Sequence, residues 1–399
     1  MTTRRQLLRQ SLGGALLAPW ASLSLAATAP TGAARFVLVL LRGGMDGLTA
    51  VPAIGDPDFA AARGALGVFA SAPLPLDGLF ALNPLLPQLH ALYGRGELAV
   101  LHAVGLPYRE RSHFDAQQVL ESGGSRPFEL NTGWLGRAIA SVGDTSAGMK
   151  AVALETAVPL VLRGPTAVDT WAPSALPEPS ADLVARLQGL YRNDPALAQA
   201  LARARGLREA PGMAANPPAM AAGGIGRGAG VTLARKAAEF LQRGTQVAVL
   251  ELGGWDSHTG QAAPGGATSN SLRTLDAMLQ ALCEGLLEGQ TWSRTVIVVA
   301  TEFGREVASN GTQGTDHGSG GAAFVLGGAV RGGRVLADWP GLAKKDRFEG
   351  RDLRITTDMR AALRAVLSQH LGVSRSALDS SVLPGSASVA ALDLLRHPA

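Results

Sequence analysis

The chain has 399 residues, of which 46% are hydrophobic and 17% charged, which is enough apolar material for one large domain or two. Its formal net charge of +4 owes much to Arg4, Arg5 and Arg9. Without these three arginines, 33 basic residues face 32 acidic ones. This balance excludes the strongly basic surface on which nucleic-acid binding depends, so we expect no nucleic-acid partner.

The first segment, residues 1–29, has the order of a secretory signal. The pair Arg4-Arg5 precedes a weakly apolar stretch, and small residues follow, with cleavage expected between Ala26 and Ala29. The paired arginines indicate the twin-arginine translocase as the partner during export. An uncleaved membrane anchor is the alternative, although the apolar stretch is shorter than the ~20 residues that a span needs. We therefore expect a periplasmic or secreted protein.

The remaining residues, 30–399, alternate strand-like runs with helix-like stretches. The first run, Phe36 to Leu41, is continuously apolar, which is typical of a strand buried on both faces. Similar runs predict strands at 98–103, 151–154, 247–252, 296–300 and 322–326. Helices are predicted over 84–94, 112–122, 181–205, 230–243, 269–288 and 358–370. The alternation predicts a single α/β domain with a largely parallel sheet, and the Ala-, Gly-, Pro- and Met-rich segment at 206–230 predicts a flexible insertion.

Polar motifs follow several of these strands. Because ligands bind outside the carboxyl ends of the strands in open α/β sheets, we expect the side chains of these motifs to converge. So many carboxylates and imidazoles repel or titrate abnormally unless a cation lies among them, and oxygen and nitrogen ligands suit Zn, Mn, Mg or Ca. The expected ligands of one or two divalent ions are Asp46, Asp256, His258, Glu302, Asp316 and His317. Any one motif alone is more typical of a turn residue or of a structural or surface histidine, so the prediction depends on their repetition.

A further polar cluster begins at Arg109 and precedes the helix predicted at 112–122. Ser112 stands where a helix N-cap is expected, and two interpretations stay open. It is a plain cap, or it is a nucleophilic or oxyanion-holding serine, with Arg109 or Arg111 binding an anionic substrate. His113 and Asp115 are candidates for further ligands or a base. A Ser-His-Asp hydrolase triad fits poorly, because the chain has no G-x-S-x-G motif.

Five motifs taken together resemble the DUF1501 family of exported bacterial proteins over roughly residues 35–370. They are Arg-Gly-Gly-Met-Asp-Gly at 42–47, Arg-Ser-His-Phe-Asp-Ala-Gln at 111–117, Gly-Gly-Trp-Asp-Ser-His at 253–258, Thr-Glu-Phe-Gly-Arg at 301–305 and Thr-Asp-His-Gly at 315–318. That family is similar to the alkaline phosphatase and sulfatase superfamily. The resemblance implies a three-layer α/β/α sandwich with a divalent-metal site at the strand ends.

The resemblance also implies roles for single residues. Ser112 matches the nucleophile, and Arg109, Arg111 and Arg305 are candidates to offset the charge that develops on the substrate. Phe303 stands where the superfamily has a histidine ligand, and the spacing of Asp256 and His258 is tighter than in phosphatases.

Three functional hypotheses follow. The leading one is an exported metal-dependent hydrolase or transferase that acts on a phosphate or sulfate ester. The alternative is a non-catalytic exported protein on the same fold, which binds an envelope component and keeps a structural or degenerate metal site. A redox or cofactor enzyme is the third, although the lone Cys283 gives no Fe–S or haem pattern and the glycine runs lack the dinucleotide fingerprint.

Overall fold

The structure is a computed structural model that describes residues 32–142, 150–173, 179–209, 227–261 and 263–396. The expected leader at 1–29 lies outside these residues, as does most of the insertion expected at 206–230. Among the residues described, each helix is too short or too polar to cross a membrane.

A mixed, mainly parallel sheet forms the centre of the fold. Within the described residues its strands lie in the spatial order β10 (Arg334–Leu336), β4 (Leu98–Gly105), β9 (Gly321–Leu326), β8 (Thr295–Thr301), β1 (Arg35–Leu41), β7 (Val247–Leu252), β5 (Ala151–Ala153) and β6 (Asp169–Thr170), with β11 (Thr357–Asp358) beside β4. β9 runs antiparallel to both of its neighbours, β4 and β8, whereas the other pairs are parallel. The predicted α/β fold with a largely parallel sheet is therefore confirmed.

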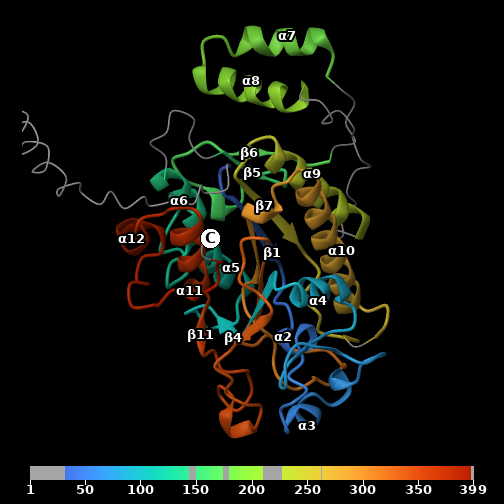
Figure 1. The fold of residues 1–399 in the computed structure, drawn as a ribbon. Coiled ribbons are helices and arrows are strands. Elements are labelled where there is room, and N and C mark those ends of the chain that lie inside the picture. The colour runs from blue at the N-terminus through green and yellow to red at the C-terminus, as the bar shows by residue number, and fades with distance from the viewer. Residues whose placement is uncertain (1–31, 143–149, 174–178, 210–226, 262, 397–399) are drawn as a thin grey trace, which may run out of the picture. The chain divides into compact units, whose positions relative to one another are not determined.

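Helices cover both faces of this sheet (Figure 1). One core contains residues of α4 (Pro87–Gly94), α9 (Arg227–Gln242) and α10 (Ala267–Glu288), and the other contains residues of α5 (His113–Ser122), α6 (Trp134–Val142) and α11 (Met359–Ala365). Successive side chains of a strand point to opposite faces, so β1 contributes Val37 and Val39 to the first core and Phe36 and Leu38 to the second. The result is the three-layer α/β/α arrangement that the resemblance implied.

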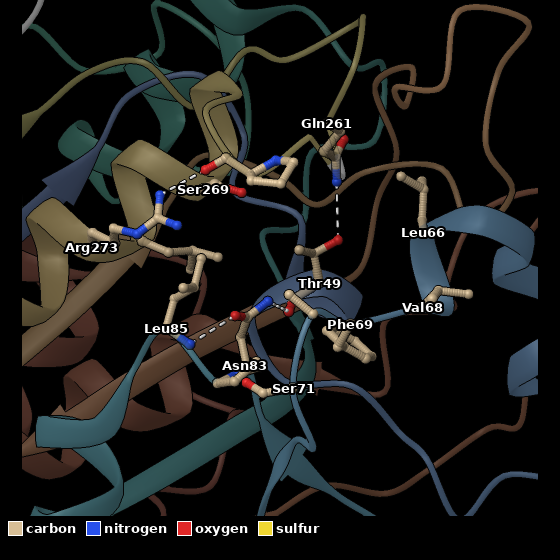
Figure 2. A pocket seen from close by; sticks show the side chains of 14 residues that line it. Thr49, Leu66, Val68, Phe69, Ser71, Asn83, Leu85, Gln261, Ser269 and Arg273 are labelled. Atoms are coloured by element: carbon tan, nitrogen blue, oxygen red, sulfur yellow. Dashed lines mark hydrogen bonds between the residues drawn. The ribbon is translucent and has the colours of Figure 1, made fainter.

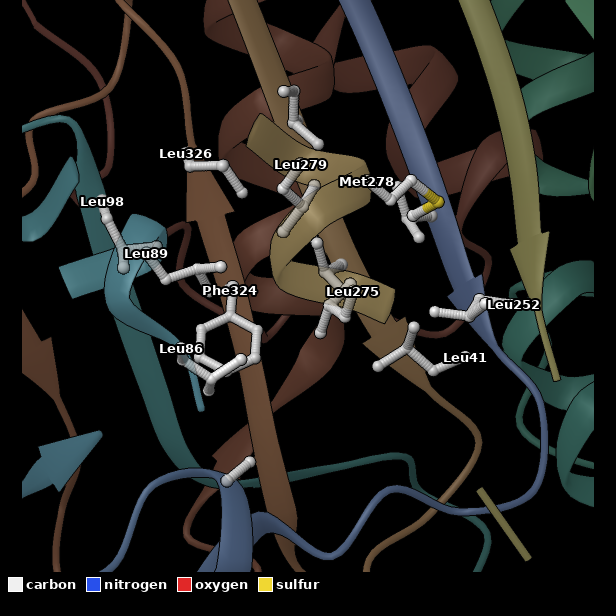
Figure 3. Close-up of a cluster of buried hydrophobic side chains, with 14 of the residues drawn as sticks. Leu41, Leu86, Leu89, Leu98, Leu252, Leu275, Met278, Leu279, Phe324 and Leu326 are labelled. Atoms are coloured by element: carbon white, nitrogen blue, oxygen red, sulfur yellow. The ribbon is translucent and has the colours of Figure 1, made fainter. Parts of the chain in front are cut away.

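The first core is packed mainly with leucines (Figure 3). Leu275 and Met278 of α10 belong to the same cluster as Leu41 of β1 and Phe324 of β9, and each of these side chains is at most 1% exposed. Helix α10 therefore lies along the middle of the sheet, where its apolar side has no access to water.

The remaining elements are short or peripheral. They are α2 (Gly47–Ala50), α3 (Phe59–Arg63), α12 (Arg375–Ala377) and the pair β2 (Leu74–Pro75) and β3 (Ala81–Leu82). The single helix predicted over 181–205 was wrong, because the structure has α7 (Ala181–Leu190) and α8 (Pro195–Glu209) there. Asp194 separates them, since its carboxylate accepts hydrogen bonds from the N–H groups of Ala196 and Leu197 at the start of α8, where Pro195 is the first residue.

Candidate functional site

The polar motifs meet at one edge of the sheet. Asp256 lies just beyond the end of β7, and Glu302 directly follows β8. Since β9 runs antiparallel, its beginning lies at this same edge, and His317 comes shortly before it. β4 leads into the loop at 106–112, and His113 is the first residue of α5. Chain segments far apart in sequence are therefore brought together at the carboxyl ends of the parallel strands, as expected.

Three imidazoles and one carboxylate converge in this place. The Nε2 atom of His317 lies 3.0 Å from Nε2 of His113 and 3.2 Å from Nε2 of His258. The Oδ1 atom of Asp256 is 2.9 Å from Nε2 of His258 and 3.3 Å from Nε2 of His317. Its Oδ2 atom is 3.4 Å from Nε2 of His113. His113, Asp256 and His317 thus offer ligand atoms that all lie within 4.8 Å of one another.

The other ring nitrogen of each histidine, Nδ1, faces an oxygen atom that accepts hydrogen bonds. The pairs are His113 with the Glu302 carboxylate (2.9 Å), His258 with the Asp316 carboxylate (3.1 Å) and His317 with the Arg111 carbonyl (3.0 Å). A hydrogen on Nδ1 suits each of these acceptors, and the Nε2 atom of a ring that is neutral then presents a lone pair. With all three rings neutral, three lone pairs and a carboxylate face one another, and a single cation among them resolves their repulsion.

This set of donors fits a divalent metal ion. Ligands held about 2.0–2.1 Å from a tetrahedral zinc ion lie about 3.3 Å from one another. The Nε2 and carboxylate atoms of His113, Asp256, His258 and His317 lie 2.9–3.4 Å apart where they are in contact. Imidazole ligands whose Nδ1–H donates to a carboxylate or a carbonyl are the usual arrangement around bound zinc.

Arg305 holds the carboxylate of this cluster. Its side chain is 1% exposed, and its Nη2 atom donates to Oδ1 of Asp256 at 2.5 Å. Burial of Asp256 favours the neutral acid, but the hydrogen bond and the charge of Arg305 outweigh it and lower the pKa of Asp256 to about 2. Arg305 also donates to backbone carbonyls on both sides, such as Gly44 (2.8 Å) and Trp255 (3.1 Å). Arg305 therefore fixes the position of Asp256, and its guanidinium does not face outward toward a substrate.

Glu302 and Asp316, which we expected among the ligands, occupy outer positions behind the histidines. The Glu302 carboxylate accepts from His113, from Gln117 (3.0 Å) and from the backbone N–H of Gly43 (2.8 Å). Burial raises the pKa of Glu302, but these donors, His113 first, lower it to about 2. Gly43 is required here, because a Cβ atom at this position would lie 2.4 Å from the backbone nitrogen of Asp256.

The Asp46 carboxylate makes its hydrogen bonds with residues outside the cluster. It is the N-cap of α2, where Oδ1 accepts from the N–H groups of Leu48 (3.0 Å) and Thr49 (3.1 Å). Its Oδ2 atom accepts from Arg63 (2.5 Å), the Thr49 hydroxyl (2.8 Å) and Gln261. Burial opposes the ionised form of Asp46, but the charge of Arg63 dominates and lowers its pKa. We correct the expected ligand role of Asp46 for this reason, since its carboxylate is already saturated by protein donors.

The two arginines near Ser112 differ in whether a carboxylate already pairs with the guanidinium. The guanidinium of Arg111 donates to Asp352 (2.7 Å) and Glu349 (2.6 Å), so it is not available to a substrate in this arrangement. The exposed side chain of Arg109 lies over the ring of Phe348 at 5.3 Å. Within the described part of the chain no carboxylate pairs with Arg109, which leaves it able to bind an anion.

Ser112 is at the N-cap position of α5, but its side chain makes no capping hydrogen bond. The expectation of a plain side-chain cap is therefore wrong. Its neighbours on both sides belong to the site, since the Arg111 carbonyl accepts from His317 and His113 faces the cluster. Ser112 is half-buried and lies in the chain between two residues that contact the cluster, at the positive end of the α5 dipole.

His113, a candidate from the sequence for a further ligand or a base, is one of the residues that converge in the cluster. The signal was present, because His113 follows the expected nucleophile and opens a helix directly after a buried strand. Phe303 stands where the resemblance implied a histidine, and its ring packs against that of His113 with centroids 4.7 Å apart.

A separate pocket lies beside Thr49 and Gln261 (Figure 2). Leu66, Val68 and Phe69 supply much of its apolar wall. Thr49 and Gln261 are bonded to each other (3.0 Å) and to Asp46, so they offer the pocket few free polar groups. None of the four converging ligand residues lines this pocket.

Comparison with known families matches residues 97–380 to the family described as "Protein of unknown function (DUF1501)". The chain belongs to this family. A comparison of this DUF1501 protein with the curated proteins gave no match.

Several solved structures are similar to this DUF1501 protein. A sulfatase from Pseudoalteromonas sp. is 13% identical, with 90% of this chain and 71% of that chain covered and a TM-score of 0.43. The phosphonate monoester hydrolase of Agrobacterium radiobacter is 14% identical, with 85% and 74% covered and a TM-score of 0.36. A member of the alkaline phosphatase superfamily from Vibrio parahaemolyticus is 13% identical, with 74% and 60% covered and a TM-score of 0.37.

Proposed function

We propose that this DUF1501 protein is a divalent-metal-dependent hydrolase or transferase of phosphate or sulfate esters that acts outside the cytoplasm. The observation that supports it most is the convergence of three imidazole Nε2 atoms and the Asp256 carboxylate, with every Nδ1 atom held by an acceptor. In this proposal His113, Asp256, His258 and His317 hold the ion, and Glu302 and Asp316 orient two of the histidines.

The bound ion would lower the pKa of a hydroxyl or water and polarise an ester oxygen. Ser112 supplies the hydroxyl that attacks the phosphorus or sulfur atom, since its side chain does not cap α5 and its neighbours hold the cluster from both sides. The bond from that atom to the ester's alcohol oxygen breaks, the alcohol leaves with the serine's proton, and water or a second alcohol then takes the group from Ser112. The N–H groups at the start of α5 and the exposed guanidinium of Arg109 attract the anionic group of the ester. The chain's own residues therefore supply the nucleophile, the grip on the anion and the positions of the ligands.

The test uses the mature protein purified from the compartment in which it folds. We expect one equivalent or more of a divalent metal by elemental analysis, and hydrolysis of aryl phosphate or aryl sulfate substrates. His258→Ala should lose the metal and the activity. The matched control is His90→Ala, since the ring of His90 makes one hydrogen bond within the described residues, to the Pro75 carbonyl (2.9 Å), and this variant should keep both.

Ser112→Ala separates metal binding from catalysis, because this variant should keep the metal and lose turnover. Native protein that neither contains nor takes up a divalent metal would refute the proposal. Activity that survives Ser112→Ala would instead reject Ser112 as nucleophile. Metal binding without turnover of any ester would favour the non-catalytic envelope-binding alternative.

A further inference from the structure

His317 is the one histidine of the cluster whose Nδ1 atom has a neutral acceptor. Glu302 and Asp316 hold His113 and His258 by charged hydrogen bonds, whereas the Arg111 carbonyl holds His317 at 3.0 Å. The orientation of His317 therefore depends on where the backbone of residue 111 points.

The backbone of Arg111 has an unfavourable conformation, with a φ of 60°. A residue with a side chain is strained in the left-handed region and keeps this conformation only where its surroundings enforce it. The Arg111 guanidinium provides the enforcing contacts, because it donates to Oδ2 of Asp352 at 2.7 Å and to Glu349 at 2.6 Å.

Asp352 is placed to hold Arg111 firmly. Its side chain is 0% exposed, and the same Oδ2 atom also accepts from the hydroxyl of Ser319 at 2.8 Å, while its Oδ1 atom has no hydrogen-bond partner among the described residues. The turn that carries Asp352 is closed by two backbone bonds with Phe348, of 2.9 Å and 3.0 Å. Arg351 in this turn donates to the backbone carbonyl of His317 at 2.5 Å. The turn at 348–352 thus contacts His317 directly through Arg351 and indirectly through Asp352 and Arg111.

We propose that Asp352 is a positioning residue for the metal ligand His317, and that it acts through the left-handed backbone of Arg111. This inference rests on the proposed metal site. Asp352 holds the guanidinium, the guanidinium holds the backbone of residue 111, and the carbonyl of that residue fixes the Nδ1–H form of His317. The Nε2 lone pair of His317 then points to the place where His113 and His258 also point.

The experiment measures zinc affinity of the mature chain by competition with a chromophoric chelator. Asp352→Asn should weaken zinc binding about 10- to 100-fold, the loss typical of an outer-shell partner of a ligand. Arg111→Gly keeps the carbonyl and accepts the positive φ without strain, so residue 111 no longer depends on Asp352. Asp352→Asn added to the Arg111→Gly variant should therefore change the affinity by less than about threefold, the scatter of uncoupled sites.

The control is Asp379→Asn, which breaks another arginine–aspartate pair, with Arg364 at 2.5 Å, outside the site. It should leave zinc affinity unchanged even if it lowers stability. If Asp352→Asn folds poorly, Ser319→Ala removes one bond to the same carboxylate, and its loss of about fivefold should likewise vanish in the Arg111→Gly variant.

An equal loss of affinity with and without Arg111→Gly, or no loss from Asp352→Asn, would overturn the positioning role while leaving the metal site intact. Wild-type protein without affinity for zinc, manganese, magnesium or calcium would overturn the proposed function and this inference with it. A second readout is the ¹⁵N spectrum of the metal-free histidines, in which His317 should be the Nδ1–H tautomer in the wild type and a tautomer mixture in Asp352→Asn.

Discussion

Arg305→Ala removes the most heavily bonded side chain of the site, and its cost follows from the contacts. The guanidinium donates to the Asp256 carboxylate and to the carbonyls of Gly43, Gly44, Trp255 and Thr315. Each buried carbonyl left without a donor costs about 1–3 kcal/mol. The Asp256 side chain is 46% exposed, so water replaces much of the ion pair and the pair contributes little beyond this. The Trp255 carbonyl keeps the N–H of Ser257 as a donor (2.9 Å), so three carbonyls are left without one. Taking the lower end for these three, we expect a loss of about 3 kcal/mol in the free energy of unfolding.

The assay is urea unfolding of the mature chain, followed by tryptophan fluorescence, in the presence of a chelator so that no bound metal adds to stability. Arg305→Lys keeps the charge but has only three donors, and it should lose about half as much. The control is Arg109→Ala, since this exposed guanidinium over Phe348 contributes at most about 1 kcal/mol. If Arg305→Ala unfolds within about 1 kcal/mol of the wild type, the buried carbonyls have found other donors and the reasoning from their desolvation is wrong.

Two further predictions concern other parts of the chain. Burial raises the pKa of Asp276 to about 6 from 3.8, although the N–H groups of Leu89 and Gln88 act in the other direction. The folded state therefore keeps a proton that the unfolded chain releases, and the free energy of unfolding falls as the pH rises from about 4 to about 6. Asp276→Asn should remove up to about 3 kcal/mol of this pH-dependent change, as measured by unfolding titrations. Replacing Arg4 and Arg5 together by lysine should retain the protein in the cytoplasm on cell fractionation, and unchanged export would rule out the twin-arginine route.

The strands could be predicted from the sequence because each of them is a continuous run of apolar residues, which indicates burial on both faces. Residues 36–41 are apolar without interruption, and the structure buries all of them in a strand paired on both sides. The division between α7 and α8 was harder to predict, since it depends on the backbone bonds that Asp194 makes and not on the spacing of apolar residues. Local hydrophobic pattern determines where a strand runs, whereas a helix boundary depends on a single capping contact.

The location of the site at the strand ends could be predicted from the sequence. Which of its carboxylates face the cluster and which hold other side chains could not. Asp46, Glu302 and Asp256 each follow a strand with glycines nearby, and nothing in those motifs separates a ligand from a carboxylate that holds something else. The difference comes from partners remote in sequence, since Arg63 and Gln261 occupy Asp46 and His113 occupies Glu302. Such contacts arise only when the sheet brings the strand ends together.

The exposure of the cluster indicates the side from which an ester reaches it. The carboxylate behind His113, that of Glu302, is 0% exposed, and the His113 ring is 21% exposed. On the other side His258 is 41% exposed and its partner Asp316 is 51% exposed. In the proposed function an anionic ester would approach the ion through solvent, so it would enter past His258 and Asp256, where the hydrogen bond from His258 to Asp316 is screened by water. The buried half, held by Glu302 and by the turn that carries Asp352, would keep the geometry, and the open half would admit the substrate.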